Sequence, residues 1–198
     1  GELAAVICIH DPLRKEANAA VRALHALGID KVVMMPGDSR KTAEAVAAEV
    51  GVDAVYAEVL PEDKAAFVRS EKAAGRKVIM IGDGVNDSPA LSEADAGIAI
   101  SSGAAIAREI ADITISSKDL FALVTLRSLS QRLMARIRRN YRFIVSFNFS
   151  LIVLGVLGIL PPTTSALLHN ISTLAISLKS MTNLLPEGEQ NSVTDFSQ

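Results

Sequence analysis

The first part of the chain alternates between short apolar runs and longer stretches with helical periodicity, which predicts alternating strands and helices. Strand-like apolar runs stand at residues 3–9, 31–35, 54–57, 77–81, 96–100 and 113–115. Helical patterns cover residues 16–27, 40–50 and 62–74, and a shorter one ends near residue 94. Each long pattern is followed by glycine, the residue that most often ends a helix. We therefore expect an α/β fold with a doubly wound parallel sheet covered by helices.

The pattern changes from about Ser117, where one long helix is expected to run through an arginine-rich stretch into apolar sequence. Residues 143–178 contain no Asp, Glu, Lys or Arg, and Pro161-Pro162 divides this apolar region. Its two pieces, 143–160 and 163–185, have about the length that a transmembrane helix needs. We expect a transmembrane helical hairpin, and the alternative is a buried helical hairpin.

Six arginines precede the first apolar piece with no acidic residue among them. They are Arg127, Arg132, Arg136, Arg138, Arg139 and Arg142. A basic cluster beside a transmembrane helix stays on the cytoplasmic side. The hairpin would then have its Pro-Pro turn outside and both chain ends inside. A solvated helix face is the alternative, and it is compatible with the same topology.

These patterns divide the chain into an α/β domain, a basic linking helix, two transmembrane helices and a polar tail that we expect to be disordered. The corresponding ranges are 1–118, 119–142, 143–185 and 186–198. The net charge of −2 gives no reason to expect a nucleic-acid partner. Cys8 is the only cysteine, so the chain has no internal disulfide, as expected of a cytoplasmic domain.

Polar residues follow the predicted strands, at the edge of a parallel sheet where ligands bind. They are Gly37 and Asp38 after the second strand, Lys64 at the start of a helix, and Asp83, Asn86 and Asp87 after the fourth strand. Carboxylates suit Mg²⁺, while Gly82 and Gly84 allow a tight turn beside the ion. Lys64 would supply a positive charge for a phosphoryl oxygen, so the set predicts a magnesium–phosphate centre. Turns, helix caps and a solvated lysine are the alternatives.

The segment GDGVNDSPALSEADAGIAI, residues 82–100, resembles the hinge motif of P-type ATPases, GDG-x-ND-x-PAL-x-x-AD-x-G-I-A. The segments DPLRKEA and LPEDK, with the arginine-rich helix leading into apolar sequence, extend this resemblance over nearly the whole chain. The resemblance implies a haloacid-dehalogenase-like, Rossmannoid phosphorylation domain that couples ATP hydrolysis to ion movement. It also implies Mg²⁺ and ATP as cofactors of the full-length protein.

By this resemblance, Asp83 would hold Mg²⁺, with Asn86 and Asp87 completing the site. Lys64 would contact the aspartyl phosphate, and Asp38 would orient ATP and the phosphoryl group. The α/β domain would be the C-terminal part of the phosphorylation domain. The two helices would lie in the plasma membrane, with the α/β domain in the cytoplasm.

The chain departs from the family pattern at two points. The family's phosphorylated aspartate, in Asp-Lys-Thr-Gly-Thr, is absent, and Asp11 lacks the residues that should follow it. We therefore expect a fragment that does not hydrolyse ATP without the missing N-terminal part of the pump. Pro36 replaces the threonine of Thr-Gly-Asp and offers neither hydroxyl nor N–H to a phosphate. Either the parent pump is impaired or this loop is rearranged.

Two rather than six apolar helices after the phosphorylation domain resemble the heavy-metal-transporting branch of the family. His169, Ser172, Thr173 and, in the first helix, Asn148 are the candidate ligands of the transported metal. We favour a divalent transition metal (Zn²⁺, Mn²⁺, Co²⁺ or Ni²⁺) over copper, because the copper-type methionine is missing. Asn170, in place of a family glutamate, argues against cobalt. Interhelical hydrogen bonds of His169 and Asn148 are the alternative.

Two other functions were weighed. A membrane-anchored haloacid-dehalogenase-like phosphatase would need a nucleophilic aspartate on the first strand, and none fits. A regulatory or docking fragment of a complete pump is compatible with Pro36 and with the missing nucleophile.

Overall fold

The computed structural model describes residues 13–82, 86–100, 110–115 and 120–184. The chain divides into two units, residues 1–124 and 125–198. The residues that we predicted to bind phosphate and Mg²⁺ belong to the first unit, and the candidate ligands of a transported metal belong to the second.

The described strands of the first unit are all parallel to their partners. β1 (Val33–Met34) pairs with β2 (Ala54–Val55). A second sheet has the order β3–β4–β5, formed by Ile79–Gly82, Ala96–Ile100 and Ile113–Ile115. The predicted parallel α/β architecture is confirmed for these strands, and the predicted strand at residues 3–9 lies outside the described residues.

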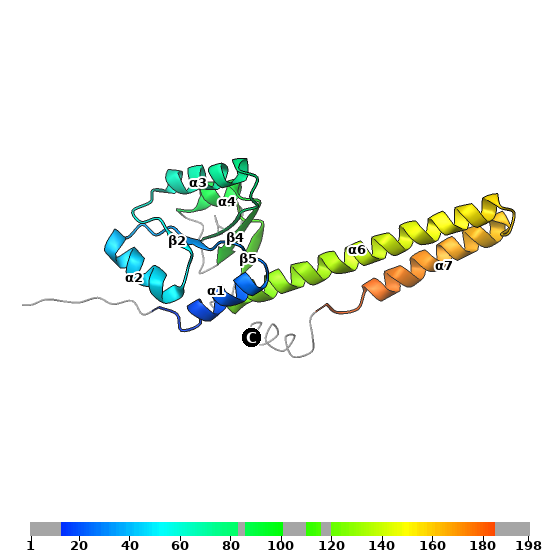
Figure 1. Cartoon of the computed structure of the whole chain (residues 1–198), viewed down its shortest axis with the longest axis horizontal. Coiled ribbons are helices and arrows are strands. Elements are labelled where there is room, and N and C mark those ends of the chain that lie inside the picture. The colour runs from blue at the N-terminus through cyan, green and yellow to red at the C-terminus, as the bar shows by residue number, and fades with distance from the viewer. Residues whose placement is uncertain (1–12, 83–85, 101–109, 116–119, 185–198) are drawn as a thin grey trace, which may run out of the picture. The chain divides into compact units, whose positions relative to one another are not determined.

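Helices connect the strands as the periodicity predicts. They are α1 (Ala17–Ala26), α2 (Arg40–Val50), α3 (Pro61–Ala73) and α4 (Ser88–Glu93). Figure 1 shows α3 and α4 together on one side of the strands. The boundaries follow local signals: α3 starts at a proline, and α2 ends before Gly51, whose φ of +79° is unfavourable for residues with a side chain.

The best-packed core of the first unit joins α3, β3 and α4. Its buried members are Ala65, Val68, Met80, Ala90 and Leu91. On its far side, the absence of a side chain at position 97 lets β4 approach α4, because a Cβ there would lie 2.7 Å from a backbone oxygen of α4. This core fixes the starts of α3 and α4 relative to the end of β3.

The described part of the second unit is a helical hairpin formed by α7 (Pro162–Ser180) and by α6 (Phe121–Val156) from residue 125 onward, and the two helices lie side by side in Figure 1. Hydrogen bonds at two levels join them. Asn140 Nδ2 donates to Ser180 Oγ at 2.8 Å, and His169 Nδ1 lies 2.8 Å from Asn148 Oδ1. The order of these pairs along the helices shows that α6 and α7 are antiparallel.

Within the described residues, no helix is both long enough and apolar enough to cross a membrane. The helical hairpin that we predicted is present, but its two transmembrane helices are not shown. The first predicted span extended to residue 160, whereas α6 ends at Val156 before a turn with Gly158 at φ +71°. The second predicted span includes histidine, asparagine, serine and threonine side chains of α7, and these make it less hydrophobic.

Candidate functional site

A lysine–aspartate ion pair stands at the centre of the candidate site in the first unit. Lys64, in the first turn of α3, donates from Nζ to Oδ1 of Asp87 at 2.7 Å. The side chains are only 14% and 13% exposed. A charge-assisted hydrogen bond that is mostly shielded from water is stronger than a surface ion pair. The fold therefore holds the ammonium group and the carboxylate in one fixed arrangement.

Gly82, the last residue of β3, provides the space in which Asp87 lies. A Cβ at this position would be 2.5 Å from Asp87 Oδ2 and 2.7 Å from its Cβ. Any side chain at position 82 would therefore displace the aspartate, which directly precedes α4. The end of β3 and the starts of α3 and α4 converge on one carboxylate.

The donor atoms around Asp87 suit a hard cation. Asn86 is exposed beside it, and a carboxylate with an amide oxygen matches the preference of Mg²⁺ for oxygen ligands. Asp83 and Gly84, which we predicted at this site, lie outside the described residues. Among the residues that the structure does describe, no group of three or more His, Cys, Asp or Glu side chains could hold a metal ion.

Asp38 and Gly37 are exposed in the loop after β1, and their loop is tied to the connection between β2 and α3. The backbone N–H of Glu58 donates to the carbonyl oxygen of Asp38 at 3.2 Å, and Val59 N–H donates to that of Pro36 at 3.4 Å. Glu58 has a φ of +58°, a left-handed conformation that is unfavourable for a residue with a side chain. The sequence pattern gave no signal for this role of Glu58.

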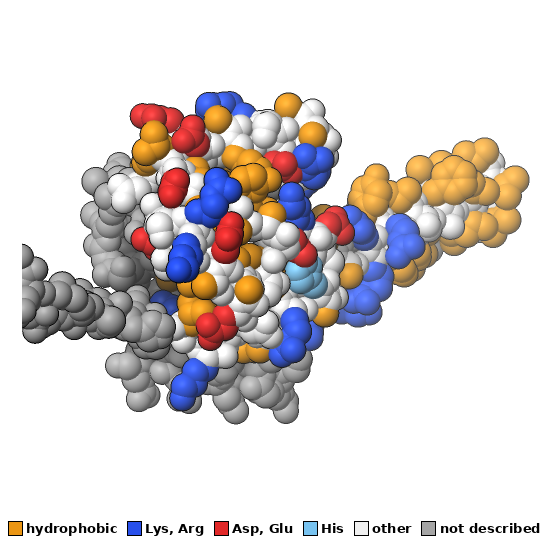
Figure 2. Space-filling view, turned by 60° about the vertical axis from the view of Figure 1, so that its left-hand side comes forward, with side chains coloured by type: hydrophobic (Ala, Val, Ile, Leu, Met, Phe, Trp, Pro, Cys, Tyr) orange, Lys and Arg blue, Asp and Glu red, His pale blue; other side chains and the backbone are white. Residues whose placement is uncertain are grey.

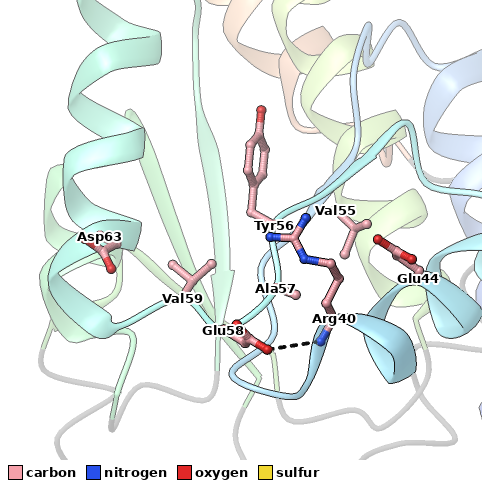
Figure 3. Close-up of a pocket in the computed structure, with 8 residues that line it drawn as sticks. All are labelled: Arg40, Glu44, Val55, Tyr56, Ala57, Glu58, Val59 and Asp63. Carbon is pink, nitrogen blue, oxygen red and sulfur yellow. Dashed lines mark hydrogen bonds between the residues drawn. The ribbon is translucent and has the colours of Figure 1, made fainter.

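A pocket of about 420 Å³ opens between the loop that carries Asp38 and the start of α3 (Figure 3). It is lined by Arg40, Glu44, Val55, Tyr56, Ala57, Glu58, Val59 and Asp63. The lining holds three carboxylates and a single guanidinium, so its net negative charge repels anions. It is a poor phosphate site, although it lies between two segments that carry predicted phosphate-binding residues.

In the second unit, the structure brings together His169 and Asn148, two of the four residues that we predicted as ligands of a transported metal. Asn148 Oδ1 is an acceptor, so His169 donates from Nδ1 and its Nε2 keeps a lone pair. Ser172 and Thr173 donate to the backbone oxygen of His169, at 2.8 Å and 3.0 Å. The interhelical hydrogen bond is the alternative that the sequence left open, and it leaves one imidazole nitrogen available to a metal.

Comparison with known proteins shows that the chain is similar to metal pumps. A protein-family model described as haloacid dehalogenase-like hydrolase matches residues 1–95. Copper-transporting ATPase 2 of Rhizobium meliloti is 44% identical over 171 residues, which cover 86% of this chain and 20% of that protein. The manganese-exporting P-type ATPase of Mycobacterium tuberculosis is 41% identical over 177 residues, covering 89% of this chain and 25% of that protein.

A solved structure shares the fold over most of the chain. The crystal structure of a zinc-transporting PIB-type ATPase in the E2.Pi state matches with a TM-score of 0.79 and 33% identity, covering 85% of this chain and 27% of the other. The chain spans about a fifth to a quarter of the length of the curated relatives described above. Residues 1–95 are thus similar to the haloacid dehalogenase-like hydrolases, and the chain matches part of a heavy-metal P-type ATPase.

Proposed function

We propose that this chain is the C-terminal part of an ATP-driven pump for heavy-metal cations, with a phosphorylation domain and the last two transmembrane helices. The observation that carries the proposal is the extent of the similarity. The first unit ends at residue 124, so an alignment over 177 residues must include much of α6 and α7. The similarity to the pumps therefore extends over the helical hairpin as well as the α/β domain.

In this proposal, Lys64 and Asp87 belong to the phosphoryl-transfer centre. The ammonium group of Lys64, held by Asp87, neutralises charge on the oxygens of an aspartyl phosphate. Asp87, Asn86 and Asp83 would hold Mg²⁺, which would supply further positive charge at the phosphoryl oxygens. Asp38 orients ATP from the loop that Glu58 fixes.

Phosphorylation of the full-length pump by ATP tests these roles. We expect Asp83→Ala, Asp87→Asn and Lys64→Met each to lower Mg²⁺-dependent phosphoenzyme formation by about 100-fold or more, as loss of a charge-stabilising group does. Lys41→Met, which removes an exposed lysine of α2, is the matched control and should leave phosphorylation unchanged. Full phosphorylation in the Asp83 or Lys64 variant would refute the assignment.

The chain alone lacks the phosphorylated aspartate, and we propose that it does not hydrolyse ATP without the rest of the pump. An antibody raised against residues 186–198 measures the size of the native polypeptide in source membranes. We expect a band several times larger than 21.0 kDa, because the relatives are four to five times longer than the matched region. A band at 21.0 kDa would favour a regulatory fragment that docks on a complete pump.

We propose that the transported ion is a divalent transition metal bound by His169 through Nε2, with Asn148, Ser172 and Thr173 nearby. The relatives described above are named for copper, manganese and zinc, so similarity does not choose the metal. His169→Ala should abolish metal-stimulated ATP hydrolysis by the full-length pump, because it removes the imidazole ligand. His25→Ala, a change within α1, is the control. Stimulation that survives in His169→Ala would place the metal elsewhere.

The proposed location is the plasma membrane, with the α/β domain in the cytoplasm and the turn between α6 and α7 outside. Exposed apolar side chains along both helices support it. In a Cys8→Ser background, a cysteine introduced by Thr164→Cys should react with a membrane-impermeant maleimide on intact cells. A cysteine introduced by Lys41→Cys should react only after lysis. The reverse pattern would overturn the topology.

A further inference from the structure

Five of the six arginines of α6 divide into two groups by what they contact. Arg136 donates to the backbone oxygens of Ser180 at 3.1 Å and Asn183 at 3.2 Å, and also to that of Thr182. Arg132 donates to the backbone oxygen of Leu184 at 3.3 Å. The last carbonyls of a helix have no partners within it and form its negative end. Arg136 therefore binds the last carbonyl of α7, and with Arg132 it holds the segment that follows this helix.

The other group consists of Arg138, Arg139 and Arg142. All three are exposed, and no hydrogen bond or ion pair joins them to another described residue. Arg138 and Arg142 are four residues apart on one helix face, where like charges repel each other. Among the described residues, this group forms no contact that would hold the hairpin together, so its positive charge can serve an external partner.

The position of these arginines on the helix indicates what that partner is. Continuing from Arg138 and Arg142 at steps of three or four residues, the same face of α6 carries four exposed apolar residues. They are Val145, Phe149, Ile152 and Val156, which are 49%, 66%, 64% and 83% exposed. We call these six residues the outer stripe. Arg136 and Asn140, which contact α7 near its C-terminal end, lie on the opposite face of α6.

Figure 2 shows the resulting distribution, with basic side chains at one end of the helical hairpin and hydrophobic side chains over the rest of the visible face. Tyr141, which is 66% exposed, lies just before Arg142, the last residue of the basic part, and four residues before Val145, where the apolar part begins. An amphipathic aromatic residue at such a boundary is typical of the region where lipid headgroups meet acyl chains. A soluble anionic partner would not require the apolar continuation.

We propose that the outer stripe lies against lipid and that Arg138, Arg139 and Arg142 bind the phosphate groups of anionic lipid headgroups. The guanidinium group pairs with phosphate through two parallel hydrogen bonds. At a rise of 1.5 Å per residue, the apolar part from Val145 to Val156 extends roughly 17 Å, about the depth of one leaflet of the hydrocarbon core. The inference rests on the proposed function only in taking the hairpin as the membrane end of the pump.

Flotation of the full 198-residue chain with lipid vesicles tests this inference. One set of vesicles contains phosphatidylcholine alone, and the other contains phosphatidylcholine with phosphatidylglycerol. Each basic side chain near an anionic surface strengthens binding about fivefold, so we expect a preference of about 100-fold for the anionic vesicles. The combined variant R138Q/R139Q/R142Q should lose this preference, and high salt should weaken it in the unmodified chain.

Two further variants distinguish a specific role of these three arginines from a general effect of the chain's positive charge. Replacement of Arg22, Lys31 and Lys41 by glutamine removes three exposed cations from the α/β unit and should keep the preference. R138K/R139K/R142K keeps the charge but not the paired hydrogen bonds, and it should bind with intermediate strength. All replaced residues are exposed, so equal helical circular dichroism is expected throughout.

Each other outcome has a distinct meaning. Equal binding to neutral and anionic vesicles would overturn the headgroup inference and leave the hairpin as a membrane element. Binding to neither kind of vesicle would overturn both the headgroup inference and the interpretation of the hairpin as a membrane element. A preference that survives in R138Q/R139Q/R142Q, or that disappears in the control variant with three other cations removed, would refute the assignment to these arginines.

Discussion

Asp87 is held by two different constraints, an attraction and an exclusion. Lys64 attracts one of its carboxylate oxygens at 2.7 Å, and the bare α-carbon of Gly82 leaves space for the other. Removing either constraint moves the carboxylate. A mostly buried ion pair also costs stability when it is broken, since one charge then stays in a poorly hydrated place.

The first prediction concerns Gly82→Ala. The added methyl group would lie within 2.5 Å of Asp87 Oδ2, so the aspartate must move and its pair with Lys64 must weaken. We expect a loss of about 1–3 kcal/mol in the free energy of unfolding, measured by denaturant titration of the chain. Gly37→Ala is the control, because a Cβ there meets no atom within 4 Å. Equal stability of the two variants would contradict this account.

Helix ends in this protein are fixed by contacts that reach across elements. Asn18 in α1 donates from Nδ2 to the carbonyl oxygens of Glu49 and Val50, the last residues of α2, at 3.3 Å and 3.1 Å. Gly51 then turns the chain at φ +79°, in close contact with Asn18. The end of α2 therefore depends on α1 as well as on its own glycine.

The second prediction compares Gly51→Ala with Gly75→Ala. Both glycines have a φ near +80°, but a Cβ at 51 would lie 2.9 Å from Asn18 Nδ2 whereas one at 75 meets nothing. Backbone strain alone should cost about 1–2 kcal/mol in both variants. Gly51→Ala should cost more, and Asn18→Ala in the same chain should remove the excess by relieving the contact. Unfolding free energies of the three variants provide the measurement, and an equal loss in both glycine variants would rule out a role for Asn18.

The third prediction concerns the end of α7. Arg136→Gln should remove the hydrogen bonds to the carbonyl oxygens of residues 180, 182 and 183, and the last turn of the helix should open more often. Hydrogen–deuterium exchange of the amides near Ser180 should then become faster. Arg139→Gln removes the same charge without those contacts, so exchange should stay unchanged in that variant. Identical exchange in both variants would show that Arg136 does not hold α7.

The stability of the α/β unit as a whole should depend on pH through Asp95. The backbone N–H of Val78, and secondarily the Lys77 ammonium group, stabilise the Asp95 carboxylate and lower its pKa from the ordinary value of 3.8. Because the pKa is lower in the folded than in the unfolded chain, the stabilisation is complete above the unfolded value. It is lost as the pH falls through the folded value.

The fourth prediction follows from that sign. The unfolding temperature of the chain should fall as the pH is lowered below about 4, and Asp95→Asn should make this fall less steep. At neutral pH the variant should be less stable than the unmodified chain, since the amide oxygen is a weaker acceptor for Val78 N–H than the carboxylate is. The same acid dependence in both proteins would exclude Asp95 as the group responsible.

Local patterns were sufficient for much of the fold. The glycines after α1, α2 and α3 and the proline before α7 predicted where these helices begin or end, because the effect of glycine and proline on the backbone does not depend on distant residues. The parallel sheet followed from the alternation of strands and helices. The pairing of Lys64 with Asp87 was consistent with the predicted centre, while Asp83 stays a prediction.

Other features depend on residues far apart in the chain. Arg136 and Ser180 are 44 residues apart, Asn148 and His169 are 21 apart, and Asp38 contacts Glu58 across a strand pair. The sequence presented the arginines of α6 as one basic cluster, and only the packing of α7 and of the segment after it divided five of them into a bound pair and an exposed group. Periodicity determines which residues share a face of an element. The partner that each face meets is decided by how the elements pack together, because such contacts form between segments that no local pattern connects.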